Sequence, residues 1–276
     1  MRSRVLATIA GKELRDARRN RWFVLFAAVF TLAALGLSVL GLSGLGTFGL
    51  AGFGRTTASL LQLVMLLVPL MGLLLGAMSI AGEREQGTLL TVLAQPVTAV
   101  EVFAGKTLGT LAAVAGVVAV GFLVSGAFLA SATSLDRVGG FLTLAACTAL
   151  LGGVHVGLGL LLSVWAGRTA TAVGLALLVW LTVVFLSDLG VIGTAMVLRL
   201  TPGQLLWVSL MNPVQAFKLV ALPALHGTLD TLGPSGRYAA DVLGPWLRLV
   251  MASVLAAWMA AALGLAAWTF RRRGAL

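Results

Sequence analysis

The chain has 276 residues, of which 59% are hydrophobic and 10% are charged. Soluble domains carry about a quarter of their residues as charged side chains, so this composition excludes an ordinary soluble domain and indicates a membrane protein. The net charge is +10, but ten of the nineteen basic residues lie at the two ends of the chain, a distribution typical of membrane flanks and not of a nucleic-acid-binding surface.

Residues 1–21, MRSRVLATIAGKELRDARRNR, contain seven basic residues and a loose apolar stripe at helical spacing. The stripe consists of Val5, Leu6, Ile9, Ala10, Leu14 and Ala17. We expect an amphipathic helix in the membrane interface, with its stripe in the acyl boundary and its cations among anionic lipid headgroups. A disordered basic leader is the alternative interpretation. The apolar run 22–42 is longer than the roughly 7–15 residues of a signal-peptide core, so we expect it to remain as an uncleaved first span.

Six stretches are long enough to cross a membrane as helices, which takes about 20 apolar residues. These stretches are 22–42, 58–81, 106–131, 139–165, 170–190 and 246–268. Because each span must satisfy its own backbone hydrogen bonds, they predict an all-α integral membrane protein with six transmembrane helices. An even number of spans puts both termini on one side, and the basic residues at both ends predict that this side is the cytoplasm.

The densest charge cluster between the spans lies in GEREQGTLLTVLAQP, residues 82–96, on the predicted cytoplasmic side. An apolar stripe with helical spacing follows the charges and consists of Leu89, Leu90, Val92 and Leu93. It predicts a short helix parallel to the membrane. Glu83 and Glu85 precede this stripe, where the N-terminus of a helix favours negative charge. A plain connecting loop needs no such features, so we expect this segment to be held by a partner.

The motif AGKT at 104–107 raises the question of nucleotide binding. A Walker A loop requires a glycine where this chain has Val100, so the chain is not expected to bind ATP itself. Thr98 and Glu101 instead have the spacing of a capping box, which predicts the start of the helix that becomes span three. Lys106 is then expected at the membrane surface.

Polar and sulfur-containing side chains within the spans are candidates for metal binding. His155 and Cys147 lie eight residues apart in the fourth span, a spacing that does not put them on one narrow face, and we expect His155 to be satisfied by packing. Met71 and Met78 share a face of the second span, and thioethers bind Cu(I), but ordinary helix packing is the favoured interpretation. We therefore predict no metal site.

Pairs of glycines four residues apart allow helices to approach closely, within a subunit or at a dimer seam. The pairs are Gly72–Gly76, Gly105–Gly109 and Gly153–Gly157.

The connection 191–245, predicted to be extracytoplasmic, is the longest in the chain and contains five prolines. Two apolar stretches in it, 203–212 and 214–222, are too short to span a membrane. We expect two short helices joined at Asn212 and Pro213. Their apolar surface fits either contact with lipid or docking of a partner protein.

The order of motifs resembles that of ABC-2 type transporter permeases. The matching residues are KELRDARRNRW at 12–22 and EREQGTL at 83–89, followed by PVT, EV and GK between 96 and 106. The resemblance implies a non-catalytic, six-span subunit that forms homodimers and is driven by a separate cytosolic ATPase, which binds ATP and Mg²⁺. It also implies that segment 82–105 contains a coupling helix that docks into the ATPase. The coupling residues it implies are Glu83, Arg84, Glu85, Gly87, Thr88, Leu89, Leu90 and Leu93.

A narrower resemblance connects MNPVQAFKL at 211–219 with permeases of the nitrous-oxide reductase maturation system, which acts in copper-site assembly in bacterial or archaeal cell membranes. It implies that the long loop docks a periplasmic β-helical accessory protein. The docking residues it implies are Leu205, Leu206, Trp207, Met211, Asn212, Pro213 and Phe217. Two alternatives remain: a generic ABC-2 exporter of a lipid, drug or glycoconjugate, and a membrane enzyme or scaffold that works without an ATPase.

Overall fold

The structure is a computed structural model that describes residues 2–43, 49–130, 138–186, 189–190, 193, 200–224 and 233–273. The other residues, which include the end of predicted span three and parts of the 191–245 loop, lie outside this description. Six helices in the described part are long and apolar enough to cross a membrane: Arg21–Val39, Ser59–Glu85, Ala99–Ala127, Gly139–Trp165, Thr169–Leu186 and Pro234–Arg273. The predicted all-α membrane protein with six spans is confirmed.

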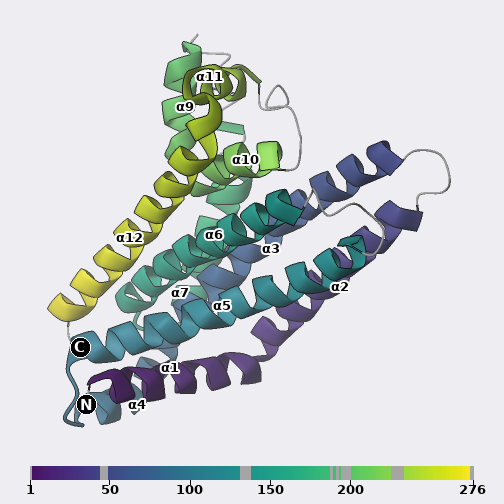
Figure 1. Cartoon of the computed structure of the whole chain (residues 1–276). Helices are drawn as coiled ribbons and strands as arrows, with labels where there is room; N and C mark the ends of the chain where they lie inside the picture. The colour runs from purple at the N-terminus through teal and green to yellow at the C-terminus, as the bar shows by residue number, and fades with distance from the viewer. Residues whose placement is uncertain are drawn as a thin grey trace.

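The helices form an elongated bundle with different elements at its two ends (Figure 1). The first half contains α1 (Arg2–Arg19), α2 (Arg21–Ser43), α3 (Gly49–Glu85), α4 (Thr88–Leu93), α5 (Ala99–Ala130) and α6 (Val138–Trp165). The second half contains α7 (Thr169–Leu181) with a π-helical turn (Thr182–Leu186), α9 (Pro202–Leu210), α10 (Pro213–Ala224), α11 (Gly233–Leu243), a 3₁₀ turn (Gly244–Trp246) and α12 (Leu247–Arg273). The helices α1 and α4 lie at the end that holds both termini, and α9, α10 and α11 gather at the opposite end of α12. We call these the terminal end and the far end.

The two central helices, α3 and α6, touch through glycines. A Cβ atom on Gly76 would lie 2.6 Å from the carbonyl oxygen of Val156 and 2.8 Å from the amide nitrogen of Leu160. One turn earlier, a Cβ on Gly72 would lie 2.8 Å from the carbonyl oxygen of Gly152. Because all three neighbouring atoms belong to the backbone, the helices can approach this closely only where there is no side chain. The predicted close approach at Gly72 and Gly76 is confirmed.

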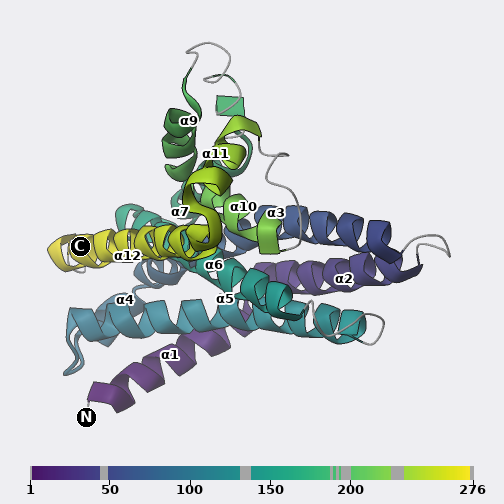
Figure 2. The same cartoon turned by 45° about the horizontal axis from the view of Figure 1, so that its top comes forward.

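The other two glycine pairs lie in contact with different helices. Gly153 and Gly157 on α6 face α12, where added Cβ atoms would meet the Sδ atom of Met259 at 2.5 Å and the Cβ of Ala262 at 2.9 Å. Gly105 on α5 faces α1, because its added Cβ would meet Ile9 at 2.7 Å. Figure 2 shows α1 running along the start of α5, on the side of the bundle away from α9 and α11.

This contact corrects the predicted position of the apolar stripe on α1. Ile9 packs on Gly105 and Ala17 is buried, so these residues face α5 and not the acyl boundary. Leu14 remains exposed. The reason is steric, because two glycines on α5 offer α1 a groove that a lipid surface cannot match. The arginines Arg4, Arg15, Arg18 and Arg19 are exposed, as expected for a basic outer face.

The segment between spans two and three contains less loop than the sequence predicts. The helix α3 continues to Glu85 and α5 begins at Ala99, so the charged residues near the predicted boundaries lie inside helices. The capping box that starts α5 is confirmed: the amide of Thr98 donates to Glu101 at 2.9 Å, and the amide of Glu101 donates to the Thr98 hydroxyl at 3.3 Å.

At the far end, α9 and α10 occupy the two stretches expected to form short helices, and their axes meet at an angle of 112°. Thr201 and Gln204 form a capping box at the start of α9. The helix α10 is deeply buried, with Val214 and Phe217 in the core together with residues of α6 and α12. The bent pair, residues 202–224, is called the elbow below.

Helix packing at Gly76 can be tested by adding one methyl group. Gly76→Ala forces two backbones apart, so we expect the free energy of unfolding to fall by about 1–3 kcal/mol, seen as a lower thermal unfolding midpoint in detergent. Gly116→Ala is the matched control, since nothing lies within 4 Å of its added Cβ. An equal loss of stability in both variants would contradict the packing argument.

Candidate functional site

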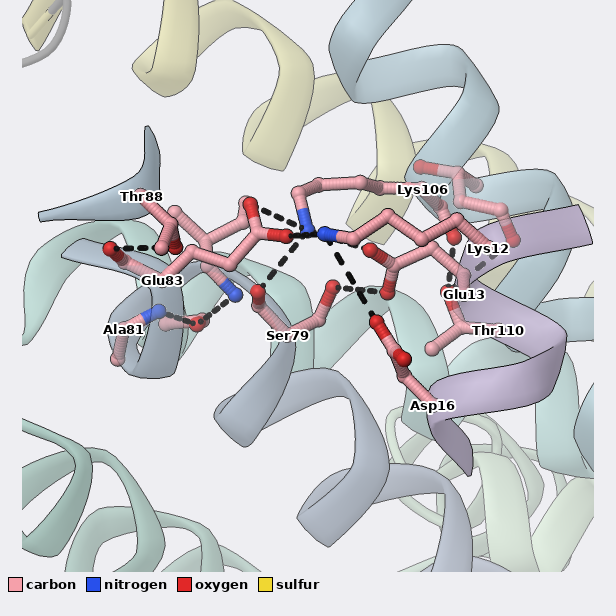
Figure 3. Close-up of polar contacts among 12 residues, drawn as sticks. Lys12, Glu13, Asp16, Ser79, Ala81, Glu83, Thr88, Lys106 and Thr110 are labelled. Atoms are coloured by element: carbon pink, nitrogen blue, oxygen red, sulfur yellow. Dashed lines mark hydrogen bonds and ion pairs between the residues drawn. The ribbon is translucent and has the colours of Figure 1, made fainter. Parts of the chain in front are cut away.

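The terminal end contains a buried group of charges where α1, α3 and α5 meet (Figure 3). The ammonium group of Lys106 is 2.6 Å from Glu13 Oε1 and 2.9 Å from Glu83 Oε2. It also donates to the carbonyl oxygen of Ser79 at 3.1 Å. The ammonium group therefore makes hydrogen bonds to Glu13 and to the Ser79 carbonyl and an ion pair with Glu83, and the side chain of Lys106 is 2% exposed. Lys12, Glu13, Glu83 and Lys106 are called the ion cluster.

A second cation completes the charge balance of the cluster. Lys12 pairs with Oε1 of Glu83 and lies 3.7 Å from Asp16 in its own helix. Burial lowers the pKa of the Lys12 ammonium, but the hydrogen bond to Glu83 and the charges of Glu83, Glu13 and Asp16 together outweigh this, so the pKa is raised above its ordinary value. The hydroxyl of Ser79 donates to Glu13 Oε2 at 3.1 Å.

Local sequence spacing explains how the cluster forms. Ser79 and Glu83 lie four residues apart on one face of α3. On α5, Lys106 lies between Gly105 and Gly109, and an added Cβ on Gly109 would come within 2.5 Å of the Cβ of Glu13. The missing side chains thus bring the backbone of α1 close enough for its acid to reach Lys106. A buried ion is tolerated only when it is paired and hydrogen-bonded, and this one is.

The arrangement adds to two expectations. Lys106 was expected at the membrane surface, and its side chain is buried between helices. Glu83 and Glu85 precede α4, as expected, and both belong to the last turn of α3. One feature of the sequence points to the pairing: Lys106 and Glu83 lie within otherwise apolar helices, where a charge needs a partner.

The neighbouring charges of the GERE segment bind the ends of two other helices. Nη1 of Arg84 donates to the carbonyl oxygens of Val164 at 3.2 Å and Ala166 at 3.1 Å, near the C-terminal end of α6, where carbonyls lack helical partners. The carboxylate of Glu85 accepts a hydrogen bond from the amide of Thr169 at 3.0 Å, the first residue of α7. The end of α3 is therefore joined to α1, α5, α6 and α7 by polar contacts.

The short helix α4 has one face inside the protein and one outside. It follows Gly87, whose φ of +73° belongs to the left-handed region that favours glycine. Leu89 is 1% exposed and packs in the same core cluster as Phe103 and Phe270. Leu90 is 58% exposed. Thr88 is also exposed, and Leu93 is half-buried.

A cleft of about 610 Å³ lies beside α4 and opens between α1 and the end of α3. Its lining includes Lys12, Asp16, Asn20, Met78, Glu83, Gln86, Thr88 and Thr91. Met78 is partly buried, and its sulfur accepts from Asn20 Nδ2 at 3.5 Å. Met71, by contrast, is fully buried.

The residues implied for partner docking divide into exposed and buried groups. Trp207 and Met211 are 73% and 77% exposed. Leu205, Leu206 and Phe217 are buried within the subunit, and Pro213 is buried as well. These buried residues cannot contact a partner in this structure, because their apolar side chains fill the space between the elbow and the bundle. The side chain of Asn212 forms hydrogen bonds with Val183 and Val214 of the same chain.

His155 is fully buried, and its Nδ1 atom is 2.7 Å from the carbonyl oxygen of Leu151 in the same helix. Cys147 is buried in the core. Across the described ranges, no group of three or more His, Cys, Asp or Glu side chains is placed to hold a metal ion.

Comparison with known proteins identifies the class. Residues 7–275 match the family described as ABC-2 family transporter protein, so the chain belongs to that family and the motif resemblance is confirmed. It is therefore a multi-pass ABC-2 permease subunit of an ABC transporter, a class that implies an ATPase partner.

Two curated relatives align over nearly their whole length. The chain is 34% identical to the probable ABC transporter permease protein NosY of Pseudomonas aeruginosa, with 98% of each chain covered. It is 32% identical to the probable ABC transporter permease protein NosY of Stutzerimonas stutzeri, with 96% of this chain and 97% of the relative covered.

The ion cluster gives a test of stability. Lys106→Met removes the cation shared by Glu13 and Glu83, so we expect the free energy of unfolding to fall by about 3–5 kcal/mol, measured by unfolding in detergent. Combining Lys106→Met with Glu13→Gln and Glu83→Gln removes the unpaired charges and should recover most of the loss. Lys12→Met is the comparison within the same cluster: because the Lys12 side chain is 46% exposed, its loss should cost about 1 kcal/mol or less. A triple variant as unstable as Lys106→Met would contradict the electrostatic explanation.

Proposed function

We propose that this permease is the membrane subunit through which a separate cytosolic ATPase, the subunit that binds ATP and Mg²⁺, drives a movement across the membrane during copper-site maturation of nitrous-oxide reductase. The observation that carries the proposal is the two-sided environment of α4. Its exposed Leu90 offers a contact to a partner, and its buried Leu89 inserts into the core of the bundle.

The energetics of α4 favour this role. Six residues are too few for an independently stable helix, so α4 keeps its position through packing. Burying a leucine side chain contributes about 1.5–3 kcal/mol, and Leu89 supplies this contact with residues of α5 and α12. A partner that displaces α4 therefore pushes on the bundle itself.

The orientation supports the same assignment. Both termini, α1 and α4 lie at the terminal end (Figure 1), and the chain's two large basic clusters lie there too. Positive residues are retained on the cytoplasmic side, so the terminal end faces the ATPase in the cytoplasm. The far end then faces the periplasm across the bacterial or archaeal inner membrane. Two copies of the permease form a homodimer in this proposal.

The maturation role draws on the far end and on the printed names of the two relatives. Trp207 and Met211 lie on the exposed face where α9 ends. Aromatic and methionine side chains are enriched at the centres of protein interfaces. We propose that this face docks a periplasmic β-helical accessory protein.

Docking of the ATPase can be tested at Leu90. Leu90→Ser removes an exposed apolar contact without opening the core, so recovery of the ATPase subunit with the solubilised permease should fall roughly tenfold, equivalent to about 1.4 kcal/mol. Leu249→Ser is the control, because Leu249 is similarly exposed but lies at the opposite end of the bundle. Unchanged recovery with the Leu90 variant would contradict the role of α4.

Docking of the accessory protein can be tested at the far end. The variant with Trp207→Ala and Met211→Ala removes both exposed side chains, and we expect it to weaken accessory-protein binding by 2 kcal/mol or more, which is about the cost of losing an interface hot spot. Binding is measured by titration of the purified complex in nanodiscs. Trp22→Ala, an exposed tryptophan at the start of α2, is the control. Normal accessory-protein binding by the double variant would contradict the docking proposal and would favour contact of this face with lipid.

A further inference from the structure

Span five, formed by α7 and its π-helical turn, is held against α3 at both ends. At the terminal end, Glu85 accepts a hydrogen bond from Thr169 at 3.0 Å. Toward the far end, the indole of Trp180 donates to the carbonyl oxygen of Leu66 on α3 at 3.0 Å. Between these points the two helices pack through small side chains, Ala77 and Ala81 on α3 and Ala172 and Ala176 on α7. The two helices are therefore expected to move together.

The elbow is attached to this pair at its bend. Nδ2 of Asn212 donates to the carbonyl oxygen of Val183 at 2.7 Å, within the π-helical turn of span five. Such turns widen the helix and shift carbonyls out of the regular pattern, and they are frequent at functional sites. Val183 also packs against the core cluster that contains α10. Asn212 thus reaches span five at the place where its helical geometry changes.

The same side chain also starts α10. Its Oδ1 atom accepts from the amide of Val214 at 2.7 Å, as an N-cap residue does. The two contacts fix the orientation of the side-chain amide, because the amide of Val214 requires an acceptor and the carbonyl of Val183 requires a donor. An aspartate retains the acceptor and loses the donor. Asparagine is therefore the short cap residue that satisfies both partners.

A different span is attached to the other side of the bend. The indole of Trp258 on α12 donates to the carbonyl oxygen of Leu210 at 3.1 Å, and Leu210 is the last residue of α9. Asn212 and Leu210 are two residues apart, yet they connect to spans five and six. The angle of the elbow is therefore determined by the relative position of these two spans.

We propose that Asn212 and Trp258 are positioning residues that fasten the elbow to spans five and six, so that movement of α3 and α7 relative to α12 tilts the face carrying Trp207. This inference rests on the proposed function, because it names the route by which movement at the cytoplasmic end reaches the docking face. Both residues act through hydrogen bonds to backbone carbonyls and not through contact with the partner.

The test measures movement of the elbow in the complete complex with its ATPase in nanodiscs. A single cysteine, Trp207→Cys, is labelled with a membrane-impermeant maleimide, with and without ATP. The background is low because the native Cys147 is buried. We expect ATP to change the labelling rate in this parent protein. Adding Asn212→Asp, Asn212→Ser or Trp258→Phe should reduce that ATP-dependent change by roughly fivefold or more, the lower end of typical coupling between sites.

Gln204→Glu is the matched control for Asn212→Asp. It makes the same amide-to-acid change in the elbow but keeps the oxygen that accepts from the amide of Thr201 at 2.9 Å, so the ATP response should be retained. Recovery of the ATPase and its hydrolysis rate should be unchanged in all variants, which separates loss of attachment from loss of folding.

Responses within a factor of about two of the parent in all three attachment variants would overturn the inference, since coupling below that size is smaller than typical allosteric effects. A lost response in the Gln204→Glu control as well would also overturn it, because any disturbance of the elbow would then have the same effect. If the parent itself shows no ATP response although the ATPase is bound, the proposed function fails, and this inference fails with it.

Discussion

Burial of the Lys106 ammonium group between Glu13 and Glu83 is the interaction on which the terminal end depends. A charge in a low-dielectric interior requires compensation, and here two acids and a backbone carbonyl supply it from two other helices. The requirement fixes the positions of α1 and α3 relative to α5, because a shift of either helix leaves an ion without its partner. The ion cluster thus joins three helices at the terminal end.

The far end is organised by a different kind of contact. There single side-chain donors reach backbone carbonyls. Neutral donors do so at Asn212 and Trp258, and the guanidinium of Arg248 donates to the carbonyl oxygen of Pro223 at 3.1 Å. Neutral hydrogen bonds contribute about 0.5–1.5 kcal/mol each, less than breaking a buried ion pair costs. We therefore expect the elbow to be easier to displace than the terminal end. In the proposed function, this difference suits a subunit that passes movement along its length.

Local signals in the sequence predicted the helices and the Thr98 capping box, since each depends on residues within one or two turns. The glycine spacing on α3 predicted a close approach at Gly72 and Gly76 but not which helix makes it. Pairing between distant residues was not predictable in the same way. Nothing near Lys106 indicates that its partner is Glu13, 93 residues away. Composition also cannot separate a buried leucine from an exposed one in an apolar stretch, which explains why Leu205 and Phe217 were placed on the docking face. The contact of Asn212 depends on a π-helical turn that has no sequence signature.

The backbone conformation of Gly87 bears on how a permease of this family could be combined with a different ATPase subunit. Its left-handed backbone sets the direction in which α4 leaves α3, and a side chain there would cost about 1–2 kcal/mol. The direction of α4 relative to α3 therefore depends on the backbone conformation of Gly87 and not on the exposed side chains of α4. If α4 docks the ATPase as proposed, exchanging its outward residues for those of a foreign permease is a direct route to a chimaera that responds to a different ATPase while its membrane part is unaltered.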